Sequence, residues 1–339
     1  MADPVKHILL IRFSSLGDVA MIVPVIAIFL RSHPEVKISI LTKEQYAPLF
    51  SHLTGVEVIH VSFEKGIRGF ISLFSLAKKI KTLEVDSIAD LHNVLRTKLL
   101  KLLLPSLNFS SLDKGRDEKR RLTKGKIFTP LKSTFERYAD VIRNLDFKLS
   151  LSEHYIKKPL ALSKEIQNQI AYFDKPMIGI APFAAFKSKM YPLQQMKRVI
   201  SSLSKNYFII LFGAGDYEIK TINNIVSCTP GTYSAAGKYT LEDELKLISN
   251  LKGMIAMDSG NAHMAAMMGV SVITLWGVTH PYAGFKPFNQ PFKNCLLADR
   301  KKFPKVPTSV YGNKYPKEYE GAISTISEDS ILQAVKRSF

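Results

Sequence analysis

The chain has little cysteine, no long hydrophobic run and few acidic residues. Cys228 and Cys295 are too few for a disulfide framework in 339 residues, so we expect reduced thiols in a cytoplasmic protein. The longest apolar run, Val19–Leu30, has 12 residues, whereas a membrane-spanning helix needs about 20. Because Arg12 and Asp18 interrupt the apolar stretch near the N-terminus, a secretory signal is not expected.

Basic residues outnumber acidic ones by 47 to 29, which gives a formal net charge of +18 at pH 7. Hydrophobic residues make up 46% of the chain and charged residues 22%, which is typical of globular proteins and excludes disordered or collagen-like chains. The length predicts two domains. Since a positive excess attracts polyanions, the candidate partners are nucleic acid, anionic lipid headgroups and phosphorylated small molecules.

Several familiar motifs are missing. The P-loop pattern is absent, and Gly213-Ala214-Gly215, which begins like a dinucleotide fingerprint, has Glu218 where the third glycine belongs. There is no H-E-x-x-H or C-x-x-C pattern, so we expect neither a metal nor a cofactor. Helix-turn-helix, zinc-finger and common RNA-binding signatures are absent too, which makes nucleic acid the weaker of the candidate partners.

Short apolar runs alternate with predicted helices along both halves of the chain. This alternation predicts parallel sheets covered on both faces. The predicted fold class is α/β, with two doubly wound, Rossmann-like domains that face each other across a cleft. The apolar runs lie at 8–11, 37–41, 56–61 and 87–91 in the first half, and at 176–181, 207–212, 253–257 and 270–276 in the second.

The expected boundaries divide the chain into an N-terminal domain, 1–160, a C-terminal domain, 161–322, and a C-terminal helix, 323–339, that packs back on the first domain. Within the first domain, residues 113–126 are dense in Lys and Arg and poor in apolar residues. This composition predicts a loop or a mobile excursion, followed by a helix at about 133–145.

The first candidate site follows the first predicted strand and consists of Ser14-Ser15-Leu16-Gly17-Asp18. In open α/β sheets, ligands bind at the carboxyl ends of the strands. Gly17 permits a tight turn, and Asp18 stands where a helix begins. Two interpretations stay open: Asp18 is a general base, or it only caps the helix.

The second candidate site, Asp258-Ser259-Gly260-Asn261-Ala262-His263, also follows a predicted strand. The free amides at the predicted helix start suit a diphosphate. The alternative is that the loop residues only cap the helix and that the histidine is buried and satisfied.

Two further strand ends carry charged residues. Lys187-Ser188-Lys189 precedes a predicted helix, and its lysines suit a leaving phosphate, although they also fit an ordinary surface. Glu218 follows the Gly213 turn and either accepts hydrogen bonds from ribose hydroxyls or lies solvated in the first helical turn.

Together, these motifs resemble those of the ADP-heptose–lipopolysaccharide heptosyltransferases, which are inverting glycosyltransferases of the GT-B fold. Tyr191 stands where the family usually has Trp, and His280 stands where it commonly has Asp. The resemblance spans about 12–281 and is carried by Arg12-Phe13-Ser14-Ser15-Leu16-Gly17-Asp18 with Pro24, Lys189-Met190-Tyr191-Pro192, the Gly213 to Glu218 turn, Asp258-Ser259-Gly260-Asn261-Ala262-His263, and Trp276-Gly277-Val278-Thr279-His280-Pro281.

The resemblance implies that domain 1–160 binds the acceptor and that domain 161–322 binds the nucleotide sugar. It also implies a role for each matching position. Asp18 is the implied base for the acceptor hydroxyl, and Lys189 meets the donor phosphates. Glu218 lies near the ribose, and Asp258 holds sugar hydroxyls of the donor. The other implied positions are Ser14, Ser15, Gly17, Ser259, Gly260, His263 and Thr279 for donor binding, and His92, Arg96 and Arg120 for acceptor binding.

The implied reaction moves a heptose or related sugar from an ADP-linked donor to a lipopolysaccharide core acceptor, by a metal-independent single displacement with inversion. The basic run from Lys114 to Arg121 would suit this anionic acceptor and the inner face of the cytoplasmic membrane. Two alternatives stay open: a transferase of the same fold that uses another nucleotide sugar for O-antigen or capsule assembly, and a non-catalytic module that binds nucleotide or nucleic acid.

Overall fold

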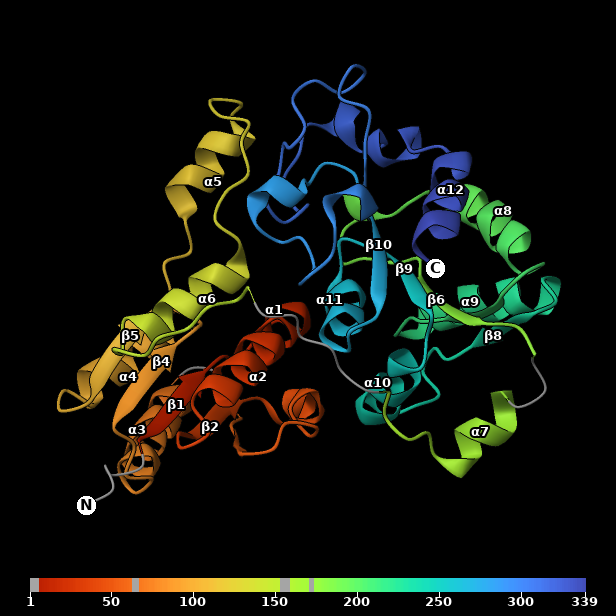
Figure 1. Cartoon of the computed structure of the whole chain (residues 1–339). Helices are drawn as coiled ribbons and strands as arrows, with labels where there is room; N and C mark the ends of the chain where they lie inside the picture. The colour runs from red at the N-terminus through yellow and green to blue at the C-terminus, as the bar shows by residue number, and fades with distance from the viewer. Residues whose placement is uncertain (1–5, 63–66, 153–158, 171–173) are drawn as a thin grey trace. The chain divides into compact units, whose positions relative to one another are not determined.

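The computed structural model describes residues 6–62, 67–152, 159–170 and 174–339 (Figure 1). The chain divides into two compact units, which are described separately. The first unit consists of Met1–Lys114 and Thr134–Tyr155, and the second of Gly115–Ser133 and Ile156–Phe339. In the described part of the chain, no helix combines the length and apolar character that a bilayer crossing requires.

The first unit contains, in its described part, a five-stranded parallel sheet of order β3-β2-β1-β4-β5. The central strand, β1, is buried along its whole length, as expected for a parallel strand covered on both faces. The strands are β1 (His7–Ile11), β2 (Lys37–Thr42), β3 (Val56–His60), β4 (Ser87–Asp90) and β5 (Asn108–Ser111), and the helices are α1 (Leu16–Ala20), α2 (Ile22–Ser32), α3 (Ile67–Lys81), α4 (Leu95–Leu103) and α6 (Thr134–Arg143).

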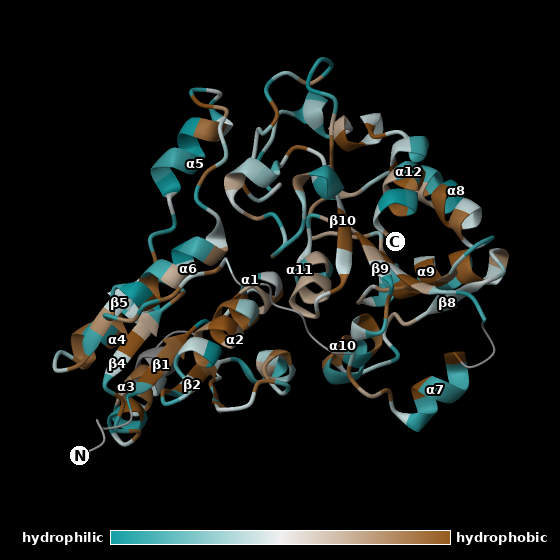
Figure 2. Ribbon diagram, in the orientation of Figure 1, coloured by the Kyte–Doolittle hydropathy of each residue, from teal (hydrophilic) through white to brown (hydrophobic). Residues whose placement is uncertain are grey.

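A proline explains why the first helical stretch is split. The sequence predicts one helix bent at Pro24, whereas the structure has α1 and α2 joined at Met21. Proline has no N–H, so Pro24 cannot bond to the carbonyl of Ala20, four residues earlier, and the break falls there. The second helix, α2, is largely apolar in Figure 2, and seven of its residues are buried.

The second unit contains, in its described part, a six-stranded parallel sheet of order β11-β10-β9-β6-β7-β8. Its core includes Ile178, Ile255 and Ile273 from the three central strands. The strands are β6 (Met177–Ala181), β7 (Phe208–Leu211), β8 (Thr232–Ser234), β9 (Gly253–Met257), β10 (Ser271–Trp276) and β11 (Cys295–Leu297), and the helices are α5 (Arg116–Thr123), α7 (Lys164–Ile170), α8 (Leu193–Leu203), α9 (Asp216–Cys228), α10 (Leu241–Ser249), α11 (Gly260–Met267) and α12 (Glu328–Ser338).

The structure corrects two expectations about the ends of the units. The basic segment 113–126, expected as a loop, contains α5, and residues 115–133 group with the second unit although they interrupt the first in sequence. The C-terminal helix, expected to pack on the first domain, buries Ile331 and Val335 in the core of the second unit and packs against α8. Apolar burial of Ile331 and Val335 therefore decides where the C-terminal helix packs.

Candidate functional site

Asp18 is the third residue of α1, the helix that follows β1 at the carboxyl edge of the first sheet. Its Oδ2 accepts hydrogen bonds from Ser15 Oγ at 2.9 Å and from the Ser15 N–H at 3.3 Å, so the carboxylate does cap α1. The Asp18 side chain nevertheless remains 26% exposed. Capping and catalysis therefore do not exclude each other here, because the capping carboxylate still reaches solvent.

A buried arginine fixes the orientation of this carboxylate. Arg12 Nη2 lies 2.7 Å from Asp18 Oδ2, and the Arg12 side chain is only 8% exposed. The same guanidinium donates to the Ser14 carbonyl through Nε and to the Leu91 carbonyl through Nη1, each at 2.6 Å. Tyr138 Oη donates to the Asp18 carbonyl at 3.3 Å. Asp18 is thus held in one position by charge-assisted bonds.

His92 belongs to the same edge, two residues after β4. Its Nδ1 accepts from the Phe13 N–H at 3.4 Å, and its ring meets Phe13 edge-on at 5.5 Å. Burial lowers the pKa of His92 to about 3. The positive charges of Arg12 and Lys114 also lower this pKa, whereas the negative charge of Asp18 raises it. Near neutral pH this imidazole is therefore uncharged and can exchange hydrogen bonds with a sugar hydroxyl.

The lowered pKa of His92 predicts an acid sensitivity of the fold. As pH falls from 6.5 toward 3, His92 binds a proton in the unfolded chain but not in the folded chain. Neutral His92 therefore costs no stability above pH 6.5, and acidification below that pH favours the unfolded state. We expect His92→Gln to reduce the fall in Tm between pH 7 and pH 5, measured by scanning calorimetry. His60→Gln, at an exposed histidine, is the control; an equal fall in Tm for wild type and His92→Gln would contradict the assignment.

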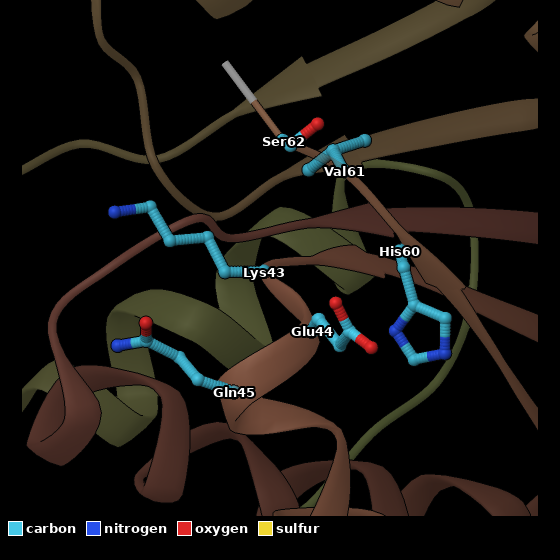
Figure 3. A pocket seen from close by; sticks show the side chains of 6 residues that line it. All are labelled: Lys43, Glu44, Gln45, His60, Val61 and Ser62. Atoms are coloured by element: carbon cyan, nitrogen blue, oxygen red, sulfur yellow. The ribbon is translucent and has the colours of Figure 1, made fainter. Parts of the chain in front are cut away.

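A hollow that no sequence motif indicated lies at the ends of β2 and β3. It has a volume of about 590 Å³, and Figure 3 shows the Glu44 carboxylate pointing toward the His60 imidazole. The segment Glu44–Leu49, which forms part of it, packs against α1, the helix that carries Asp18. The ends of β2 and β3 lie at the same carboxyl edge of the sheet as Asp18. Their position after two predicted strands could have marked the lining residues as candidates. The lining residues are Lys43, Glu44, Gln45, His60, Val61 and Ser62.

In the second unit, three strand ends bring together a buried polar cluster. Lys189 Nζ lies 3.0 Å from Asp258 Oδ2, and their side chains are 13% and 9% exposed. Thr279 Oγ1 donates to the same oxygen at 2.9 Å. Asp258 Oδ1 makes no hydrogen bond with any described residue, so it is available to a ligand hydroxyl. Sequence reasoning singled out all three residues, but only the structure shows that they touch.

Close packing fixes the position of Lys189. The hydroxyl of Ser188 donates to the Gly312 carbonyl at 2.6 Å in a buried bond. Gly312 has φ +85°, and a Cβ there would lie 2.5 Å from Lys189 Cδ. A Cβ at Gly277 would lie 2.4 Å from the Ser188 carbonyl oxygen. Two glycines therefore leave the space that the lysine stem occupies.

The loop after β9 is only partly open to solvent. Asp258 and His263 are 7% and 8% exposed, whereas residues 259–261 are half-buried. Ser259 is the N-cap of α11, and its Oγ is buried without a hydrogen-bond partner among the described residues. An orphaned hydroxyl beside free helix amides is a place where a ligand oxygen can bind.

Glu218 lies at the start of α9, after β7 at the same sheet edge. Its Oε2 accepts from the Ala214 N–H at 2.9 Å, and it lies close under Gly213, where a Cβ would be 3.0 Å away. Glu218 is half-buried, so the carboxylate that closes this turn is still accessible. Its role near a ribose stays a prediction.

His280 shapes the loop that carries Thr279. The Nδ1 of His280 accepts from the Tyr282 N–H at 3.1 Å, which caps a short turn that begins at Pro281. Burial lowers the pKa of His280 to about 4, and the charge of Arg300 adds to this effect. The histidine that replaces the family's common Asp is therefore a neutral, structural cap.

The remaining predicted positions are spread over both units. Ser14, Ser15 and Gly17 lie in the first unit with Asp18, and Arg96 is exposed on α4. Arg120 is exposed on α5, which belongs to the second unit. Among the described residues, no three His, Cys, Asp or Glu side chains are grouped as metal ligands.

Solved structures similar to this one cover nearly the whole chain. A glycosyltransferase of family 9 from Veillonella parvula matches with a TM-score of 0.74 at 19% identity, over 99% of this chain and 98% of that one. The Escherichia coli ADP-heptose lipopolysaccharide heptosyltransferase II matches with a TM-score of 0.69 at 19% identity, over 98% of both chains. These similarities confirm the predicted GT-B fold class.

Sequence comparison agrees with the structural one. The chain is 24% identical to lipopolysaccharide heptosyltransferase 3 from Escherichia coli over 295 residues, which are 83% of this chain and 85% of that protein. It is 22% identical over 291 residues to the lipopolysaccharide core heptosyltransferase OpsX from Haemophilus influenzae. These residues cover 81% of this chain and 80% of that protein. The model of glycosyltransferase family 9 (heptosyltransferase) matches residues 73–315, well over half of the chain. The chain therefore belongs to glycosyltransferase family 9, the heptosyltransferase family, and is a glycosyltransferase.

Proposed function

We propose that this chain transfers a heptose from ADP-heptose to a lipopolysaccharide core acceptor, by a single displacement with inversion and without a metal. The observation that carries the proposal is the buried cluster of Lys189, Asp258 and Thr279 beside the start of α11. The names of the relatives support the sugar and the acceptor. One similar structure is described as heptosyltransferase WaaC with ADP, which supports the nucleotide.

In this proposal the second unit holds the donor. The diphosphate rests on the free amides at the start of α11, where the unpartnered Ser259 Oγ adds a donor. Lys189 uses one N–H for Asp258 and keeps two for the phosphate oxygens. Asp258 Oδ1 accepts from a hydroxyl of the sugar. Stabilising the charge that grows on the leaving diphosphate is then the main catalytic contribution.

The first unit supplies the base. The acceptor oxygen forms a bond to the anomeric carbon while that carbon's bond to the diphosphate breaks, and ADP leaves with the electron pair. Asp18 takes the proton from the acceptor hydroxyl, and neutral His92 orients the acceptor. A single attack from the face opposite the leaving group inverts the anomeric configuration. Ser14, Ser15 and Gly17 bind the donor, and Arg96 and Arg120, the latter from the second unit, bind the acceptor.

The experiment is a transfer assay with the purified full-length chain, ADP-heptose and a lipopolysaccharide core acceptor, in buffer containing EDTA. We expect ADP release and a product whose anomeric configuration, read by NMR, is opposite to that of the donor. Retention of configuration, or turnover only after a divalent cation is added, would contradict the proposed mechanism. UDP- and GDP-sugars in parallel test the alternative donors, and binding of nucleotide without ADP release would indicate a non-catalytic module.

We also propose that the enzyme works in the cytoplasm and binds the inner face of the cytoplasmic membrane peripherally, where its acceptor is anchored. The support is the net charge of +18. Each basic residue near an anionic surface contributes about 1 kcal/mol, and salt screens this attraction. Binding to phosphatidylglycerol vesicles should fall steeply with added salt, and binding that ignored both salt and headgroup charge would refute this part.

A further inference from the structure

Residues 308–312 bridge two loops of the second unit. At the start of this segment, two successive N–H groups donate to the Val278 carbonyl at 3.0 and 3.3 Å. At its end, the Gly312 carbonyl accepts a buried hydrogen bond from Ser188 Oγ at 2.6 Å. Val278 and Ser188 each directly precede a member of the buried polar cluster, which consists of Lys189, Asp258 and Thr279. The segment is therefore fixed against the polar cluster at two points.

Tyr311 is the exposed side chain of this segment. It is 54% exposed, whereas the other four residues of 308–312 are buried or half-buried. The Tyr311 ring lies 5.9 Å from the ring of Phe285, at an interplanar angle of 56°. Phe285 is half-buried, and the Lys119 ammonium lies 4.4 Å from the centre of its ring. Phe285 therefore supports the Tyr311 ring, while much of Tyr311 remains open to solvent.

The two rings, which we call the aromatic pair, lie close to the polar cluster. A Cβ at Gly312 would lie 2.5 Å from Lys189 Cδ. Successive Cα atoms are about 3.8 Å apart, so the Tyr311 Cα lies within about 8 Å of the lysine stem. Phe285 follows Thr279 by six residues, after the turn Pro281–Ala283. The aromatic pair therefore borders the two loops that hold the lysine and the threonine.

A nucleotide sugar has a surface that the polar cluster does not match. Lysine and helix amides suit the diphosphate, and a carboxylate oxygen suits a sugar hydroxyl. A pyranose ring also has a face of carbon-bound hydrogens, which carry a small positive charge. The face of an aromatic ring is apolar and carries partial negative charge, so it packs well on such hydrogens. The aromatic pair is therefore complementary to a sugar ring and not to a phosphate.

We propose that Tyr311, supported by Phe285, packs against the sugar ring of the bound donor and helps to select that sugar. This inference rests on the proposed function and deepens it, because it assigns a residue that reads the transferred sugar separately from the nucleotide. ADP and ADP-heptose present the same diphosphate to Lys189, but only ADP-heptose presents a sugar to Tyr311. Loss of the ring should therefore weaken binding of the nucleotide sugar selectively.

The test is titration calorimetry on the full-length chain, without acceptor, so that no transfer occurs. Tyr311→Ala should weaken binding of ADP-heptose roughly 3- to 10-fold and leave the affinity for ADP unchanged. Tyr311→Leu keeps apolar bulk but no ring and should behave like the alanine variant, whereas Tyr311→Phe should bind as the wild type does. The control is Phe74→Ala, which removes a ring that is 60% exposed on α3 in the first unit and should change neither affinity.

Equal losses of affinity for ADP and ADP-heptose in Tyr311→Ala would mean that the substitution only displaces Lys189, which would overturn the proposal. An unchanged affinity for ADP-heptose, or an equal loss in Tyr311→Phe, would overturn it too. UDP- and GDP-sugars are compared with UDP and GDP in the same way. Should the wild type bind none of these nucleotide sugars, the proposed function falls and this inference with it, whereas a failure confined to the Tyr311 variants leaves the proposed function standing.

Discussion

Replacing Asp18 with asparagine should lower kcat for sugar transfer about a hundredfold or more, because general-base catalysis contributes roughly 10²- to 10⁴-fold. Asparagine keeps the size of the side chain and still accepts the hydrogen bonds from Ser15, but it cannot take a proton. Arg12 keeps its two carbonyl partners, so the local fold should persist. The measurement is ADP release at saturating donor and acceptor, with donor affinity followed separately by calorimetry.

The chain offers a matched control for this substitution. Asp243 occupies the same third position of α10, accepts from Thr240 Oγ1 at 2.9 Å and is 29% exposed, close to the 26% of Asp18. Asp243→Asn should leave kcat unchanged. It should lower Tm less than Asp18→Asn does, because Lys246, the partner of Asp243, is more exposed than Arg12, the partner of Asp18. If Asp18→Asn retained transfer within a few-fold of wild type, or if both variants lost the same activity, Asp18 would be only a helix cap.

Replacing Lys189 with methionine should have the second large effect. Loss of one preorganised group that stabilises a developing charge costs roughly 10²- to 10³-fold in kcat. The substitution also leaves Asp258 buried without its cation. Removing one partner of a buried ion pair lowers the free energy of unfolding by about 3 kcal/mol or more. Both effects are measurable on the full-length chain, by ADP release and by urea denaturation.

A double variant separates the two effects of this substitution. In Lys189→Met/Asp258→Asn the uncompensated carboxylate is gone, so the free energy of unfolding should recover in part, while activity stays low. Lys187→Met, at an exposed lysine two residues away, is the control and should retain both stability and activity. Recovery of activity together with stability in the double variant would show that Lys189 acts only through the fold.

The strands that the sequence predicted follow apolar runs, and three short strands at sheet edges were missed. The structure adds β5, β8 and β11, each of three or four residues and each at the edge of its sheet. An edge strand such as β5, with the sequence Asn-Phe-Ser-Ser, is only partly buried and shows no apolar run. It is a strand because it pairs with β4, which lies about twenty residues earlier in the sequence, so its own residues do not predict it.

Residues 115–133, which we call the strap, show the same limit for a helix. Its composition predicted a loop, because α5 has one buried apolar residue, Leu122. Acidic residues in its first turn and basic residues in its last turn favour a helix through the helix dipole, a signal that was present in the sequence. The strap packs on the second unit through cation–π contacts with Phe285 and Arg300, which lie more than 150 residues later in the sequence.

The amino-acid sequence by itself determined the parallel α/β architecture, since apolar strands, small-residue turns and helices alternate at short range. It also placed the loops that carry Asp18, Lys189, Glu218 and Asp258 after strands, where ligands bind. Only the tertiary structure decided that Lys189 pairs with Asp258 and that Arg12 orients Asp18, as well as which unit holds the strap. Such contacts join residues from separate strand ends, so they exist only once the sheets have formed and the charges have been buried together.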